Sequence, residues 1–203
     1  MNDDMETTPT IEVQREQQEW PAQGHWTYED YRRLPDDGYR YEVIDGVLLM
    51  SPPPTPRHQD VCGELAFAMR VFVRHRQLGK VYEAPIEVVL PGIAAPVQPD
   101  IFFISTERLG IVGRTRIEEA PDLVVEILSP GNWLADRREK FRAYEMARVQ
   151  EYWIVDPKQR TIEVYVLQEE NYALAGRYGP GEVAQSELLK GFAVDVSEIM
   201  GEK

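Results

Sequence analysis

Apolar positions in this chain recur at two spacings, and short polar stretches separate the segments that they define. Five segments show the apolar runs or the alternation typical of β-strands, at residues 80–90, 98–105, 121–129, 151–157 and 161–167. A further apolar segment, 41–51, contains Asp45-Gly46, a strong signal for the turn of a β-hairpin. The runs at 98–105 and 121–129 are nearly continuous, which is typical of strands in the middle of a sheet.

Three other segments have helical features. Thr55-Pro56 predicts the start of a long helix, because proline suits the first helical position, and Gly79 is expected to end it. The apolar stripe of this helix consists of Val61, Cys62, Leu65, Met69, Phe72 and Val73. A second helix is predicted at about 133–147, and a short one at about 28–34.

These elements predict an α/β (α+β) fold in which a central mixed sheet is flanked by helices. Residues 91–96 are expected to form a loop, and 172–181 and 188–196 to form edge strands or loops. Residues 1–24 are polar and without periodicity, so we expect a disordered acidic tail followed by a single domain at 25–203.

The charge balance changes what this fold can be expected to bind. A net charge of −13 argues against strong non-specific binding of nucleic acid, because phosphate contacts need lysine and arginine. The predicted tail carries −5 of this charge, which leaves −8 on the remainder. A local basic face, or a site that needs a metal to accept phosphate, is compatible with that balance.

The cellular setting is predicted from what the chain lacks. Its single cysteine, Cys62, cannot form an intramolecular disulfide, and its place on an apolar helix stripe favours a packed thiol over a nucleophile. The sequence has no apolar stretch long enough to cross a membrane and no signal-peptide pattern at residues 1–20. A cytoplasmic protein with no membrane partner is expected.

Two carboxylates stand where apolar residues are expected. Glu126 interrupts the run 123–128, and Asp100 stands at the start of the run 101–104. A buried carboxylate must be paired, protonated or bound to a metal, and two on adjacent strands could together bind Mg²⁺. The alternative for each is a structural role, paired with an arginine or capping a loop.

Three further residues have both a structural and a functional interpretation. Lys140 lies four residues after Asp136, as in a surface ion pair, but it also shares a helix face with Tyr144 that should point at the sheet. His58 lies on the apolar stripe of the long helix, where a packed or capping histidine is the more common case. Glu42 could simply face solvent from its strand.

Taken together, these residues belong to a recognisable series of motifs. The series consists of Tyr41-Glu42-Val43-Ile44-Asp45-Gly46, Ser51-Pro52-Pro53, Arg57-His58-Gln59, Val97-Gln98-Pro99-Asp100, 120–130 around Glu126, Lys140 and 151–157. It resembles the Uma-two family, a group of restriction-endonuclease-like proteins within the PD-(D/E)xK nuclease superfamily. The resemblance runs from about Thr27 to Val196, and several motifs recur in the expected order.

The resemblance implies a restriction-endonuclease-like fold and a metal-dependent site for hydrolysis of phosphodiester bonds. Pro99-Asp100 matches the first acidic element and Glu126 the second. Leu128 stands where the simplest pattern of the superfamily has lysine, and Lys140 matches the position to which the family has moved it. By this resemblance Asp100, Glu126 and the Ile127 carbonyl would hold Mg²⁺ or Mn²⁺, with Lys140 beside them.

The remaining implications concern roles and partners. Glu42 and His58 match further family positions, so the expected catalytic set is Asp100, Glu126, Lys140, Glu42 and His58. DNA is the expected substrate by analogy, and a homodimer is considered because nucleases that cut two strands often pair. Two alternatives stay open: a catalytically silent binding or regulatory protein on the same fold, and a metal hydrolase of small phosphodiesters.

Overall fold

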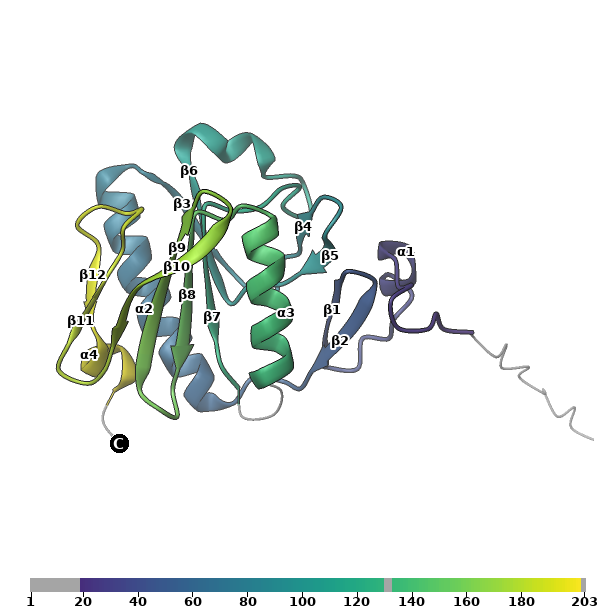
Figure 1. The fold of residues 1–203 in the computed structure, drawn as a ribbon, viewed down its shortest axis with the longest axis horizontal. Helices are drawn as coiled ribbons and strands as arrows, with labels where there is room; N and C mark the ends of the chain where they lie inside the picture. The colour runs from purple at the N-terminus through teal and green to yellow at the C-terminus, as the bar shows by residue number, and fades with distance from the viewer. Residues whose placement is uncertain (1–18, 130–132, 202–203) are drawn as a thin grey trace, which may run out of the picture.

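A central sheet of six strands organises the molecule, and the computed structural model describes residues 19–129 and 133–201. The strand order is β10-β9-β8-β7-β6-β3 (Figure 1). The strands are β3 (Gly79–Glu83), β6 (Ile101–Ser105), β7 (Leu123–Ile127), β8 (Glu151–Asp156), β9 (Thr161–Gln168) and β10 (Asn171–Tyr178). The β7–β8 pair is parallel and the other pairs are antiparallel, so this is the mixed sheet that the sequence predicted.

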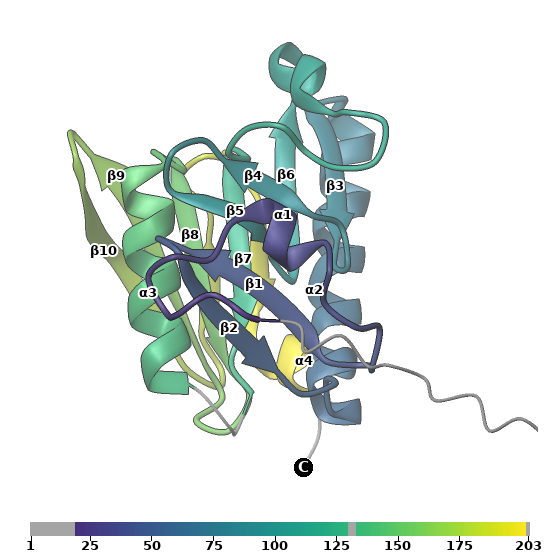
Figure 2. The ribbon, with the colours of Figure 1, turned by 90° about the vertical axis from the view of Figure 1, so that its right-hand side faces the viewer.

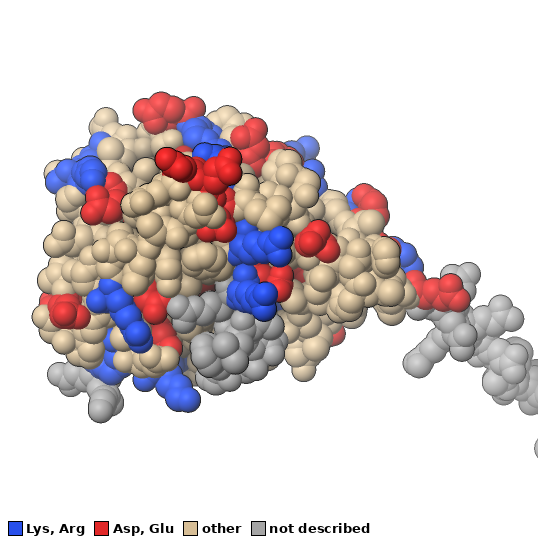
Figure 3. All heavy atoms as spheres, viewed as in Figure 1, with Lys and Arg blue, Asp and Glu red and all other residues tan. Residues whose placement is uncertain are grey.

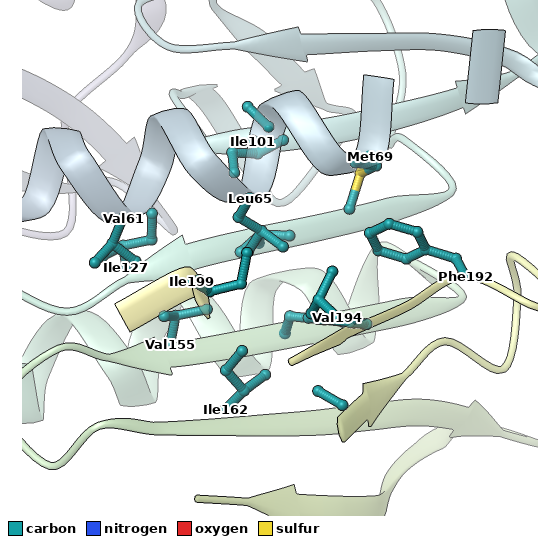
Figure 4. Close-up of a cluster of buried hydrophobic side chains, with 14 of the residues drawn as sticks. Val61, Leu65, Met69, Ile101, Ile127, Val155, Ile162, Phe192, Val194 and Ile199 are labelled. Atoms are coloured by element: carbon teal, nitrogen blue, oxygen red, sulfur yellow. The ribbon is translucent and has the colours of Figure 1, made fainter. Parts of the chain in front are cut away.

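The two faces of this sheet are covered by different elements. Helix α2 (Pro56–Arg76) covers one face together with the hairpin of β11 (Val183–Gln185) and β12 (Ala193–Asp195) and with α4 (Val196–Met200). Figure 4 shows Val61, Leu65 and Met69 of α2 in one apolar cluster with sheet residues such as Ile127 and with Phe192, which lies near Met69. This apolar cluster fixes the position of α2 against the strands that carry the candidate site.

The opposite face carries helix α3 (Trp133–Met146) and a second sheet. The order of the second sheet is β2-β1-β5-β4, formed by β1 (Arg40–Ile44), β2 (Val47–Ser51), β4 (Val88–Leu90) and β5 (Ala94–Val97). A second core lies here, in which Ile44, Leu90 and Val97 pack with Phe102 and Tyr144. In Figure 2 the β1–β2 hairpin is seen between α3 and α2.

The hairpin and the long helix follow from local sequence signals. Asp45 and Gly46 both have positive φ, of 48° and 70°, as a two-residue turn of this kind requires, which confirms the predicted hairpin. The hydroxyl of Thr55 accepts a hydrogen bond from the His58 amide at 3.2 Å, so the helix begins where Thr55-Pro56 predicted. The helix ends at Gln77 in the left-handed conformation; the expectation that Gly79 ends it was wrong, since Gly79 is the first residue of β3.

Three other predicted segments differ from the structure. The segment 80–90 is not one strand but two, β3 and β4, which belong to different sheets; Pro85 lies between them and has no amide proton for a ladder. The segment 91–96, expected to be a loop, contains most of β5. The C-terminal segment includes the short helix α4, which begins at the cap residue Asp195 and had not been expected.

The N-terminal part of the chain is described from residue 19 onward. Most of the predicted tail, residues 1–18, lies outside the described residues. The Gln23 side chain exchanges hydrogen bonds with the backbone of Leu48, and the Gly24 amide donates to the Gly46 carbonyl at 2.8 Å. Helix α1 (Tyr28–Tyr31) then begins at Thr27, whose side chain and that of Asp30 form a reciprocal cap. None of the described helices is both long and apolar enough to cross a bilayer.

Candidate active site

Five side chains that the sequence singled out come together where the two sheets meet α2 and α3. They are Glu42 on β1, His58 in the first turn of α2, Asp100 directly before β6, Glu126 on β7 and Lys140 on α3. Each is buried, with between 2% and 6% of its surface exposed. Positions spread over almost half of the chain therefore converge on one buried polar cluster.

Lys140 joins two of the carboxylates. Its ammonium donates to both oxygens of Glu126 at 3.1 Å and lies 2.8 Å from Oε2 of Glu42. The other oxygen of Glu42 accepts a hydrogen bond from the Gln98 amide at 2.6 Å. The alternative interpretation of Glu42 as a solvent-facing residue is therefore wrong, because the side chain is buried against Lys140.

Asp100 is held by a second set of partners. Its Oδ1 accepts from the Arg40 guanidinium at 2.8 Å, and its Oδ2 accepts from the Ile127 amide at 2.8 Å. The Nε2 atom of His58 lies 3.2 Å from the same Oδ2. The bond from Ile127 ties Asp100 to the strand that carries Glu126, so the two carboxylates have a fixed relation across β6 and β7.

Three of these partners were not identified from the sequence. Arg40 opens β1 and reaches Asp100, Gln98 binds Glu42 through its amide, and the Tyr144 hydroxyl donates to Oε1 of Glu126 at 2.7 Å. Only the placement of Tyr144 on the sheet-facing side of its helix could be inferred. The other two contacts join residues that are 56 or more positions apart, and no local pattern indicates them.

Burial and neighbouring charges move the acidities in this cluster. Burial raises the pKa of the Glu126 carboxyl, and the nearby Asp100 and Glu42 add to that effect while Lys140 opposes it. Burial alone would also raise the pKa of Asp100, but the hydrogen bond from His58 and the charge of Arg40 hold it below its usual value. Burial disfavours the charged form of Lys140, yet Glu126, Glu42 and Asp100 together keep its pKa above the ordinary value.

A small cavity gives access to this cluster. It has a volume of about 60 Å³ and is lined by Asp100, Glu126, Lys140 and the Ile127-Leu128-Ser129 segment, among others. That volume accommodates several water molecules or a hydrated ion. A larger cleft of about 820 Å³ lies next to it and shares Arg40, His58 and Asp100 as walls. Asp100 therefore lines both the small cavity and the larger cleft, and Glu126 lines the small cavity.

The donor set fits a hard divalent cation. The cluster contains the carboxylates Glu42, Asp100 and Glu126 against the cations Arg40 and Lys140, so the carboxylates outnumber the cations. Oxygen donors are those that Mg²⁺ and Mn²⁺ prefer, and Mg²⁺ is usually held by one or two protein carboxylates plus water. Within residues 19–129 and 133–201, no three His, Cys, Asp or Glu side chains gather closely enough to form a metal site by themselves.

The surface around α3 mixes charges of both signs. On the face seen in Figure 3, basic and acidic side chains of the described residues alternate and form no single broad basic patch. Arg138 and Arg142 on α3 are exposed. Any contact with phosphate on this face would therefore be local, in line with the low overall basicity.

Comparison with known proteins gives the chain a family and a fold relative. The family model for Uma2, described as "Putative restriction endonuclease", matches residues 28–197. A crystal structure described as a "putative nuclease belonging to DUF820" from Anabaena variabilis superposes with a TM-score of 0.70 at 19% sequence identity. That match covers 86% of this chain and 97% of the other. The comparison with curated proteins gave no match.

Proposed function

The chain belongs to the Uma2 family, and from that premise we propose that it is a metal-dependent endonuclease that hydrolyses phosphodiester bonds in DNA. The observation that carries the proposal is the convergence of Asp100, Glu126 and Lys140 on one small cavity beside an open cleft. Strongly perturbed titratable groups that share a cavity favour a functional site over a purely structural ion pair.

Asp100, Glu126 and the Ile127 carbonyl would hold Mg²⁺ or Mn²⁺. Within the described residues, Asp100 has one partner at Oδ1 and Glu126 has one at Oε2. Since a carboxylate oxygen can accept two hydrogen bonds, each keeps a free position. The cation, when bound, polarises a phosphoryl oxygen and makes water easier to deprotonate.

Lys140 has the role of orienting the attacking water and stabilising negative charge on the phosphoryl group. Its ammonium is fixed by Glu126 and Glu42 and lines the cavity, so it needs little reorganisation when charge develops. Glu42 holds Lys140 in place and can contact the cation through a water or help to bind a second ion.

The remaining groups hold the carboxylates in position. Tyr144 fixes Glu126, while Arg40 and His58 fix Asp100. Such outer partners keep metal ligands in the productive orientation. The Nδ1 atom of His58 is buried and has no hydrogen-bond partner in the described part of the chain, so His58 is assigned the role of orienting Asp100 through Nε2.

A cleavage assay tests the proposal. The purified full chain is incubated with single-stranded DNA, duplex DNA and a small aryl phosphodiester, each with Mg²⁺, with Mn²⁺ and with a chelator. We expect cleavage of DNA that requires the metal and is lost in Lys140→Ala. Arg142→Ala, an exposed cation on the same helix, is the matched control and keeps the activity.

Two other outcomes would replace the proposal. Cleavage of the small phosphodiester without cleavage of either form of DNA would favour a hydrolase of small phosphodiesters. A folded wild-type protein that cleaves none of the three substrates and binds neither metal would favour a silent binding or regulatory protein.

A further inference from the structure

The outward face of α2 carries exposed apolar side chains at its middle. Phe67 is 68% exposed and Val71 is 52% exposed, whereas the opposite face of the same helix is buried in the core. Gly63 lies one turn before Phe67, and a side chain added there would meet nothing within 4 Å. Gly63, Phe67 and Val71 are four residues apart, so they form one ridge along the helix.

Charged residues flank this ridge in a fixed order. Asp60 and Glu64 lie in the half of α2 that contains its N-terminus, and Arg70 and Arg74 lie in the other half. All four are exposed, and with 3.6 residues per turn they lie within about 60° of the direction of Phe67. The outward face therefore has an acidic half, an apolar centre and a basic half.

The order of these residues is symmetric about Phe67. Gly63 lies four positions before Phe67 and Val71 four positions after it. Glu64 and Arg70 form the pair at three positions before and after, and Asp60 and Arg74 form the pair at seven. Each acidic residue on one side thus corresponds to an arginine on the other. A helix with this pattern is complementary to itself when a second copy runs in the opposite direction.

We propose that α2 of one chain packs antiparallel against α2 of a second copy, about a two-fold axis at Phe67. Phe67 then meets its own equivalent, and the glycine at 63 faces Val71 of the second copy, which allows the two helices to approach closely. Asp60 lies level with the arginine at 74 of the second copy, close to the centre line of the contact, and Glu64 lies level with that at 70, across the width of the contact. Arg70, which pairs with Glu83 of its own chain, lies at the edge of this contact.

Other occupants fit this surface less well. A parallel helix pair would bring acid against acid and base against base. A nucleic acid or an anionic membrane would be repelled by Asp60 and Glu64 over half of the surface. Only a partner with the reverse charge order satisfies both halves, and a second copy of this chain supplies it.

The candidate site itself lies away from the proposed contact. His58 lies on the buried side of α2, about opposite to Phe67 on the helix, whereas the cleft beside it extends to Gln59 and Glu83, near the edge of the contact. The proposed dimer therefore goes beyond the proposed function and does not depend on it.

Sedimentation velocity of the full chain tests the apolar centre. We expect a concentration-dependent dimer whose dissociation constant rises about a hundred-fold in Phe67→Glu, because a central buried aromatic is lost to a charge. Gly63→Leu should have a similar effect, since the added side chain has open space in the single chain and blocks only the partner. Leu174→Glu on β10, which replaces a residue that is 53% exposed elsewhere, is the control and should dimerise as the wild type does. A monomeric wild type, or a dimer unaffected by Phe67→Glu and Gly63→Leu, would overturn the proposal.

A mixing experiment tests the charge order. One variant carries Asp60→Arg with Glu64→Arg, and the other carries Arg70→Glu with Arg74→Glu. Each variant alone should be monomeric, because every charged pair becomes repulsive, while an equimolar mixture should form a one-to-one heterodimer. Homodimers of either variant as tight as the wild-type dimer, or a mixture that stays monomeric, would show that α2 does not pair in this register.

Discussion

Two buried glutamates on neighbouring parallel strands are held in opposite ways. Glu151, at the start of β8, is fully buried and accepts hydrogen bonds from neutral donors only: the Trp153 indole, the Ser186 hydroxyl and the amides of Glu187 and Leu188. Glu126, near the end of β7, is held by the ammonium of Lys140 and by Tyr144, with Asp100 and Glu42 close by.

The difference indicates that Glu151 has a structural role, whereas Glu126 is a candidate functional group. The four donors to Glu151 satisfy both of its oxygens and join β8 to the segment 186–188. Glu126 shares its site with two other carboxylates and lines a cavity. Such crowding of like charges costs stability in the absence of a cation, which is the usual sign of a site kept for function.

The largest expected effect separates the two glutamates by activity. Glu126→Gln keeps the shape of the side chain but removes the carboxylate that is proposed to bind the metal, so DNA cleavage should fall roughly a thousand-fold or more. Glu151→Gln should cleave at nearly the wild-type rate when assayed below its unfolding temperature. The comparison fails if both variants lose activity equally while both remain folded.

Removal of the positive charge of Lys140 should lower the stability almost as strongly as Glu126→Gln lowers the activity. Lys140→Met removes the ammonium that contacts both Glu126 and Glu42, and we expect a loss of about 3–5 kcal/mol in the free energy of unfolding. Urea denaturation measures it, and added Mn²⁺ should recover part of the loss because it binds the native state. Arg142→Met, exposed on the same helix, should change stability by no more than about 0.5 kcal/mol. A loss as small as that of the control would mean that Lys140 does not compensate the carboxylates.

Stability should show the opposite order from activity, with Glu151→Gln less stable than Glu126→Gln. Glu151→Gln turns one acceptor oxygen into a donor that faces other donors, so a loss of about 1–3 kcal/mol is expected. Glu126→Gln should be no less stable than the wild type in a metal-free buffer, because it relieves repulsion with Asp100 and Glu42. Thermal unfolding of both variants gives the answer; equal destabilisation would remove the distinction between a structural and a functional carboxylate.

The smallest effect on activity is expected from the hydroxyl that positions Glu126. Tyr144→Phe removes only the hydroxyl that orients Glu126, so cleavage should fall roughly tenfold, as for other partners of metal ligands. Unfolding free energy should change by about 1 kcal/mol. Tyr172→Phe, which removes a partly buried hydroxyl bonded to the Val149 carbonyl, is the control for activity, because Tyr172 does not line the cavity. Equal activity of Tyr144→Phe and the control would show that the hydroxyl has no orienting role.

Local sequence signals were enough for the elements that position the site. Asp45-Gly46 defined the hairpin that carries Glu42, and Thr55-Pro56 defined the helix start that carries His58. Charges inside apolar runs pointed to Asp100 and Glu126, because burial of an unpaired carboxylate is costly wherever it occurs. These are short-range or single-residue arguments, and they need no knowledge of the tertiary structure.

Contacts between distant segments could not be obtained in this way. The segment 80–90 has the apolar pattern of a single strand, and nothing in it shows that β3 and β4 join different sheets. Arg40 has no unusual neighbours in sequence, yet it binds Asp100 because β1 is brought against the start of β6. The choice between a surface pair and a sheet-facing position for Lys140 also required the packing of α3 against β1 and β7.

Calorimetric titration of Mn²⁺ into the wild type, Glu126→Gln and Glu151→Gln, all confirmed as folded, tests the central claim most directly. The account predicts saturable binding by the wild type and by Glu151→Gln, and loss of that binding in Glu126→Gln. A folded wild type that takes up no Mn²⁺, or a Glu126→Gln variant that binds as the wild type does, would contradict it.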